Sequence, residues 1–173
     1  MVSHYLPLHN QYTKPKTNNQ EKFMTENNLL SLEKKFQNLQ PLMEIIASDM
    51  KEAVEKNFDE EGRPNKWLDL TPQTKKQREI QGTWPGKILQ RRGGGDGLLG
   101  SISTKATNSE AVVGTNKVYA AIHQFGGNIH QSGISKKGKS WVRNITMPAR
   151  PFLVFTDDDV EDIKENIVSW LVS

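Results

Sequence analysis

The chain has no cysteine in its 173 residues. Disulfides, thiolate metal sites and cysteine nucleophiles are therefore excluded. Long apolar runs are also missing, because no stretch approaches the roughly 18 apolar residues of a membrane span. The first residues lack both the apolar segment and the small-residue cleavage site of a secretory signal peptide. We therefore expect a soluble protein that is made in a cytoplasm and has no membrane partner.

The net charge is small but the charges are unevenly distributed. The formal value is +3, from 23 basic and 20 acidic residues, which by itself does not imply nucleic acid. Residues 26–61 carry nine acids and four bases, residues 62–105 nine bases and three acids, and residues 156–173 six acids and one base. A basic middle between acidic ends permits association by charge complementarity. Ordinary solvated faces would give the same distribution.

The sequence divides into an extension and one domain. Residues 1–25 are rich in Asn, Gln, Lys and Thr and show neither a strand nor a helix period, so we interpret them as a flexible extension. Residues 26–173 are long enough for a single domain with its own core.

Apolar spacing predicts the helices. A short helix is expected at 29–39, and an amphipathic helix follows from Leu42 to Phe58, with Pro41 in its first turn. Thr71 and Pro72 are a typical start for a short basic helix. Residues 156–159 resemble a capping box, which predicts a C-terminal helix after them.

Strands are expected between these helices. We predict strands at 99–106, 111–114 and 141–147, a short helical segment at 119–125, and a flexible loop at 126–140. Helices followed by strands and a final helix indicate an α+β fold. We expect a mostly antiparallel sheet packed against a long N-terminal helix and a C-terminal helix.

No motif supports catalysis or a cofactor. The glycines at 95, 97 and 100 have dinucleotide-motif spacing, but a strand-like run follows them where that motif requires a helix. The four histidines have no carboxylate at metal-ligand spacing. Ser101 and Ser103 lack a nucleophile-elbow motif. We therefore expect no enzyme activity, no metal and no cofactor.

Two basic patches are candidate nucleic-acid sites. One combines Arg91 and Arg92 with the basic residues of 75–78, and the other lies at 136–143. Trp84 and Trp141 are nearby in sequence, but no known nucleic-acid-binding module is present. Nucleic acid is therefore not the expected partner.

Four segments carry a family resemblance. They are residues 67–74 (WLDLTPQT), residues 87–102 around the glycine cluster, residues 113–127 with the run YAAIHQFGG, and residues 148–153 (PARPFL). In order and spacing they resemble the phage virion morphogenesis family, the tail completion proteins of Mu-like and related myophages, over residues 29–172. The expanded glycine cluster at 93–97 and the extra residues 1–25 depart from the family pattern.

The resemblance implies a structural protein in the virion, assembled in the host bacterial cytoplasm. Such proteins act at the tail end or the head–tail junction, and related neck and tail-end proteins often form rings. The partners it implies are further copies of the chain and other tail or neck proteins. A head-assembly factor and a DNA-binding protein near the genome end remain alternatives.

The candidate interface residues come from the matched motifs and the basic loops. They are Arg91, Arg92, His123, Gln124, Phe125, Gly126, Gly127, Lys136, Lys137, Arg150 and Phe152. A core position is an alternative for Phe152, and a buried polar network is an alternative for His123, Gln124 and Arg150. The loops at 90–97 and 126–140 are polar and glycine-rich, so we expect them to become ordered on assembly.

Overall fold

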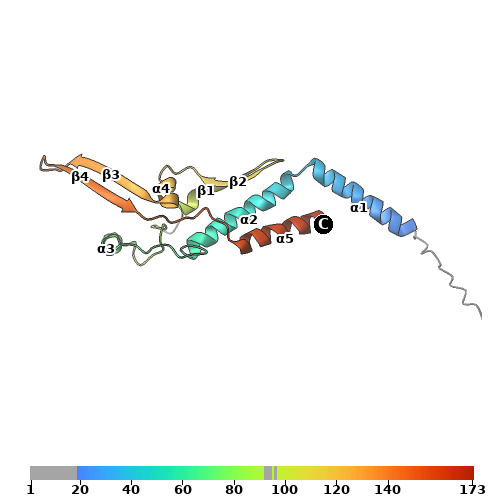
Figure 1. Cartoon of the computed structure of the whole chain (residues 1–173), viewed down its shortest axis with the longest axis horizontal. Coiled ribbons are helices and arrows are strands. Elements are labelled where there is room, and N and C mark those ends of the chain that lie inside the picture. Colours follow the sequence, from blue (N-terminus) through green and yellow to red (C-terminus); the bar gives the residue numbers. More distant parts are fainter. Residues whose placement is uncertain (1–18, 92–94, 96) are drawn as a thin grey trace, which may run out of the picture. The chain divides into compact units, whose positions relative to one another are not determined.

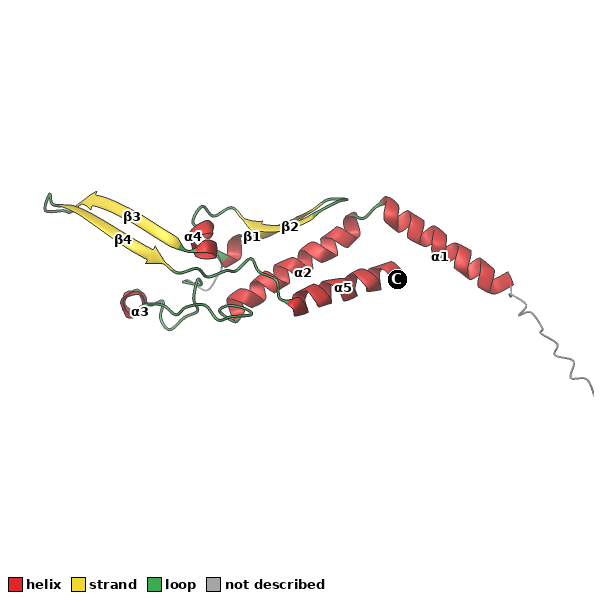
Figure 2. Cartoon of the chain, in the orientation of Figure 1, coloured by secondary structure: helices red, strands yellow, loops and turns green. Residues whose placement is uncertain are grey.

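A computed structural model describes residues 19–91, 95 and 97–173, and their side chains from residue 28 onward (Figure 1). The predicted α+β class is confirmed, and Figure 2 distinguishes the helices (red) from the strands (yellow). The helices are α1 (Asn19–Gln37), α2 (Gln40–Asp59), α3 (Pro72–Ile80), α4 (Ala120–Phe125) and α5 (Asp157–Val172). The strands are β1 (Ile102–Ala106), β2 (Ala111–Thr115), β3 (Gly127–Ile134) and β4 (Ser140–Met147).

Residues 38–173 form one compact unit, and α1 belongs to a separate N-terminal unit. The helix predicted at 29–39 is present, but it begins earlier, at Asn19. Gln, Glu, Lys and Met favour helix even without an apolar stripe, so periodicity alone missed this start. Residues 1–18 of the predicted extension lie outside the described residues.

The amphipathic helix α2 is the centre of the compact unit. It packs against α5, β1 and β2 and buries Leu42, Val54 and Phe58. Pro41 lies in its first turn, as predicted. Its N-terminal amides are capped from a distance, because the Asn108 side chain accepts hydrogen bonds from the N–H groups of Leu39 (2.6 Å) and Gln40 (3.1 Å).

The other two predicted helix starts are also confirmed. The Thr71 hydroxyl accepts a hydrogen bond from the Thr74 N–H at the start of α3. Thr156 and Asp159 form a reciprocal capping box at the start of α5.

Within the described residues the strands form two separate antiparallel hairpins. In the first, β1 pairs with β2 from Ile102–Thr115 to Ala106–Ala111. Residues 99–101, predicted as strand, form a 3-10 turn before β1. In the second, β3 pairs with β4 from Gly127–Met147 to Ile134–Ser140.

The predicted loop at 126–140 is wrong, because most of it is β3. Hydrogen bonds cross the ladder from His130 to Asn144 (2.7 Å) and from Thr146 to Asn128 (2.9 Å). The Trp141 ring covers Gly133, where an added Cβ would lie 2.9 Å from Cζ2 of the indole. A polar strand stabilised by such pairs lacks the apolar alternation on which the prediction relied.

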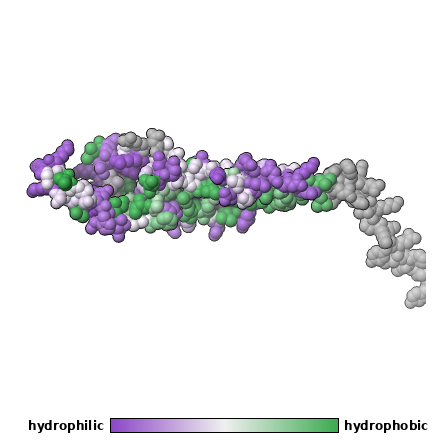
Figure 3. Space-filling view, turned by 90° about the horizontal axis from the view of Figure 1, so that it is seen from above, coloured by the Kyte–Doolittle hydropathy of each residue, from purple (hydrophilic) through white to green (hydrophobic). Residues whose placement is uncertain are grey.

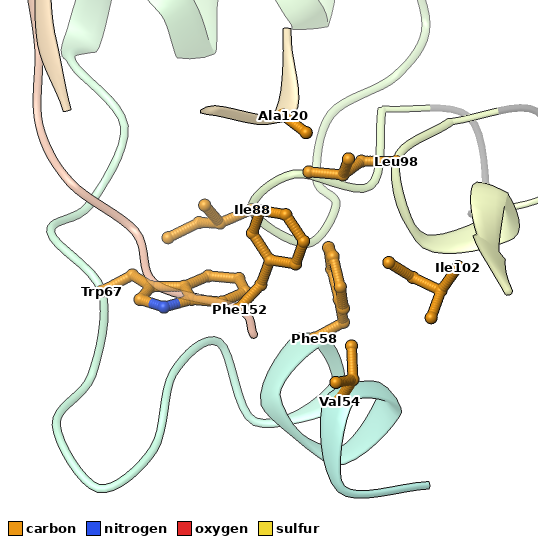
Figure 4. Close-up of a cluster of buried hydrophobic side chains, with 8 residues drawn as sticks. All are labelled: Val54, Phe58, Trp67, Ile88, Leu98, Ile102, Ala120 and Phe152. Atoms are coloured by element: carbon orange, nitrogen blue, oxygen red, sulfur yellow. The ribbon is translucent and has the colours of Figure 1, made fainter. Parts of the chain in front are cut away.

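The core joins segments that are far apart in the sequence. Its buried members are Val54, Phe58, Trp67, Ile88, Leu98, Ile102, Ala120 and Phe152. Figure 4 shows three of their aromatic rings gathered together. The ring centroids of Phe58 and Trp67 lie 5.7 Å apart, and those of Phe58 and Phe152 lie 5.5 Å apart, which are favourable aromatic distances.

Candidate assembly interface

Two of the four family-like segments, residues 113–127 and residues 148–153, are hydrogen-bonded to each other. The Arg150 N–H donates to the His123 carbonyl (2.7 Å). The Gln124 Oε1 accepts the N–H groups of Phe152 and Leu153, each at 3.0 Å. Residues 148–153 therefore lie along α4 and reach the core through Phe152, whose side chain is fully buried.

The two glycines after α4 allow this close approach. Gly126 has a φ of +69°, and a Cβ there would lie 2.7 Å from the Ala149 nitrogen. Gly127 has a φ of +143°, and its Cβ would lie 3.0 Å from the Ile122 side chain. Side chains are unfavourable in both conformations, so these glycines have an internal structural role.

Arg150 ties these motifs to residues 67–74. It is buried, and it donates from Nε (3.0 Å) and Nη2 (2.8 Å) to the Leu68 carbonyl. The Trp67 indole in turn donates to the Pro151 carbonyl (2.9 Å). Three of the four family-like segments thus form one internal network, and burial lowers the pKa of the Arg150 guanidinium.

The candidate residues therefore fall into two groups. Gln124, Arg150 and Phe152 hold the fold together. Gly126 and Gly127 belong with them, because their conformations permit the close approach of residues 148–149 and Ile122. Phe125, Lys136 and Lys137 are exposed, the first at the end of α4 and the lysines at the turn of the β3–β4 hairpin. Arg91 is also exposed and bonds to Gln81, whereas Arg92 and much of the 90–97 loop lie outside the described residues.

A buried polar network surrounds Arg63, and the sequence patterns did not predict it. The Asn57 amide is fully buried in α2, and it donates to the carbonyls of Phe152 (2.9 Å) and Val154 (2.8 Å). Arg63 donates to Asn57 Oδ1 (2.9 Å) and also pairs with Asp159. One sequence feature could have indicated it: the polar residue Asn57 lies four residues after Ala53, on the apolar face of its helix.

Asp159 is ionised in this network. Burial opposes its ionisation, but hydrogen bonds from the Thr156 backbone and from Arg63 outweigh burial. Its pKa therefore lies below the ordinary value of 3.8.

A groove of about 840 Å³ lies beside the internal network. We call it the α3–β4 groove, because its walls come chiefly from those two elements and from residues 68–71. Its apolar lining is Leu68, Leu70, Ile80, Leu89, Ile145 and Met147. Its basic lining is Lys76, Arg78, Arg143 and Arg150.

His123 also lines this groove. Its Nδ1 is buried and has no hydrogen-bond partner among the described residues. Burial lowers the pKa of His123, and the nearby Arg150 cation lowers it further, so the neutral imidazole is favoured.

Comparison with known families identifies the chain's relatives. Residues 19–172 match the family described as the phage virion morphogenesis family. The chain belongs to this family. The match includes all the helices and strands described above, and it begins where α1 begins.

Individual relatives are prophage and phage proteins. The chain is 42% identical over 130 residues to the Mu-like prophage FluMu G protein 2 of Haemophilus influenzae, covering 75% of this chain and 76% of the relative. It is 34% identical over 142 residues to the FluMu G protein 1, covering 78% and 84%. It is 29% identical over 112 residues to the "Putative capsid assembly protein G" of Escherichia phage Mu, covering 63% and 64%. No solved structure matches the chain.

Family membership supports a role in phage assembly. Within the described residues, no group of histidine and acidic side chains is arranged to hold a metal ion. Across the same part of the chain, none of the helices is long and apolar enough to cross a membrane.

Proposed function

We propose that the protein acts in tail completion or head–tail joining, and that it does so as a ring of identical subunits within the virion. The phage virion morphogenesis family supports the assembly role. Within that role, joining two parts of a particle requires surfaces that remain open to other chains in the isolated subunit. The chain exposes such surfaces on its second hairpin and on α4.

The observation that carries the proposal is the exposed apolar surface of the β3–β4 hairpin. Ile134 and Val142 are each 76% exposed near its turn and share one face of the ribbon, and Trp141 is 43% exposed on the other face. At the other end of β3, Phe125 is 78% exposed. A two-stranded hairpin is marginally stable alone, and clustered exposed apolar side chains mark contact sites. Figure 3 shows hydrophobic residues among hydrophilic ones over one face of the molecule.

The first test is the solution mass of the purified protein, measured by light scattering after size exclusion at low and high salt. A discrete oligomer supports the ring. A monomer under every condition contradicts self-assembly and directs the search to tail-tube and portal-side partners.

The second test is a deletion of the gene in a phage or prophage that carries it. Complete heads and separate tails in electron micrographs would support a joining role. Missing or malformed heads would instead support a capsid-assembly role, the candidate that the name of the phage Mu relative favours.

A further inference from the structure

The α3–β4 groove combines exposed apolar side chains with positive charge. Ile80 is 79% exposed on one wall and Leu68 is 66% exposed on another. Ile145 and Met147 lie on the same face of β4, because alternate residues of a strand share a face. Grooves with this character bind amphipathic helices in other proteins.

The positive charge of the groove is compensated only in part, because Glu61 acts on Arg78 and Asp69 acts on Arg150 electrostatically without forming ion pairs. Arg78 is buried and donates to the Lys87 carbonyl (3.0 Å), while Arg150 donates to the carbonyls of Leu68 and Asp69. None of the ion pairs formed within the described residues involves Arg78, Arg150, Lys76 or Arg143. Among the described acids, Asp69 alone lines the groove, and it pairs with Lys75. An occupant with carboxylates would therefore be attracted.

The same chain carries a surface of the opposite character on α5. Asp158, Glu161, Glu165, Val168 and Val172 follow one another at intervals of three and four residues and are all exposed. They therefore form one stripe along the helix. Val168 is 58% and Val172 80% exposed. The stripe is acidic at its start and apolar at its end, which complements the groove in both respects.

We infer that the acidic–apolar stripe of α5 from a second copy of this chain binds in the α3–β4 groove. This inference rests on the proposed self-assembly and assigns one contact between subunits, separate from the exposed tip of the β3–β4 hairpin. The groove and the stripe are different surfaces of one chain, so the contact is head-to-tail. Repeated head-to-tail contacts close into a ring when the rotation between subunits permits closure.

The absence of cysteine allows a direct test. Two single variants of the full chain, I80C and V168C, are purified, mixed and treated with copper–phenanthroline, which oxidises two nearby thiols to a disulfide. We expect a cross-linked dimer in the mixture and none from either variant alone, because only a head-to-tail contact brings these two positions together. A mixture of K105C with V168C is the matched control, because Lys105 is exposed on β1 and lies outside the groove.

Charge reversal provides an independent test. R143E in the groove and E165R on the stripe are each expected to weaken self-association by about tenfold or more. The double variant is expected to recover most of the loss. K105E is the control for net charge and should associate like the natural chain.

The outcomes separate the inference from the proposed function. If the protein is an oligomer but I80C and V168C do not cross-link, this interface is wrong. The same holds if both charge reversals leave self-association unchanged. In either case the proposed ring is not contradicted. Cross-linking of I80C or V168C with itself also overturns it, because the contact would then be symmetric. A protein that is monomeric throughout overturns the ring and this interface together.

Discussion

Arg63 and Asp159 form a two-pronged ion pair that joins the segment after α2 to the start of α5. Nη1 of Arg63 lies 3.0 Å from Oδ1 of Asp159, and Nη2 lies 2.9 Å from Oδ2. The side chains are only 13% and 4% exposed. Nη2 also donates to the Ala53 carbonyl (2.8 Å), so the guanidinium bridges both helices. Charged pairs with this parallel geometry are stronger and more directional than single contacts.

Replacing Arg63 with alanine should destabilise the protein strongly. The Asp159 carboxylate would remain buried without its cation, which typically costs about 3–5 kcal/mol. Urea unfolding followed by circular dichroism measures this loss. Lys66→Ala is the control, because the Lys66–Glu60 pair is exposed and should contribute no more than about 1 kcal/mol. Equal losses for the two variants would show that Arg63 has no special role.

The two halves of this ion pair differ in how far sequence could predict them. The capping box predicted the position of Asp159, because that motif depends on residues three apart. Arg63 is separated from Asp159 by 96 residues, and no local pattern connects them. Sequence periodicity likewise predicted α2 and α5, but not that Asn57 and Arg63 form a polar network between them.

Replacing Gly126 with alanine should destabilise the contact between α4 and residues 148–153. The new Cβ would meet the Ala149 nitrogen at 2.7 Å and the Met147 oxygen at 2.9 Å, in a backbone with positive φ. We expect a loss of more than about 1 kcal/mol in the free energy of unfolding. Gly138→Ala is the matched control, since its φ of +76° is similar but nothing lies within 4 Å of the new Cβ. The difference between the variants isolates the steric part, and no difference would contradict the close approach.

Replacing Gln124 with leucine should destabilise more than replacing it with glutamate. Leucine removes the oxygen that accepts the Phe152 and Leu153 N–H groups. Each buried donor left without a partner costs about 1–3 kcal/mol. Glutamate keeps an acceptor for both N–H groups, although it loses the weaker donation to the Leu153 carbonyl at 3.4 Å and adds the desolvation cost of a half-buried carboxylate. Urea midpoints for the two variants give the comparison, and the opposite order would exclude this role for Gln124.

His123 should make stability depend on pH just below neutrality. Burial and the Arg150 cation hold its pKa below the ordinary value of 6.5, so the unfolded chain takes up a proton first as pH falls. The contribution of neutral His123 to the free energy of unfolding is complete above about pH 6.5. It is lost as the pH falls from there through the lower pKa of the folded state. His123→Gln should flatten this dependence in urea unfolding series, whereas His130→Gln, on an exposed strand, should retain it. A dependence unchanged in His123→Gln would assign it to another group.

The hairpin was the main failure of prediction, and its chemistry explains why. Apolar and polar residues do not alternate along residues 127–134, because both faces of the β3–β4 ribbon are largely exposed. Their strand structure depends on partners in β4, such as Asn144 for His130. β4 was predicted because Trp141, Val142 and Ile145 favour strands. A strand that is stabilised mainly by its partner strand cannot be predicted from the apolar periodicity of its own residues.

Deleting residues 131–139 should separate folding from assembly. The deletion joins His130 directly to Ser140 and keeps the pairing of residues 127–130 with 144–147. None of the deleted residues belongs to the buried core, so the compact unit should still fold, with the loss in the free energy of unfolding limited to the ladder contacts that are removed. Ile134 and the turn lysines are lost, so we expect particles that are not completed, measured as a loss of infectious titre and by micrographs.

Lys136→Ala with Lys137→Ala removes only the turn charges and shows whether the ribbon itself is needed. A deletion that unfolds the protein would contradict its structural independence, and a normal titre with normal folding would exclude the hairpin tip from assembly.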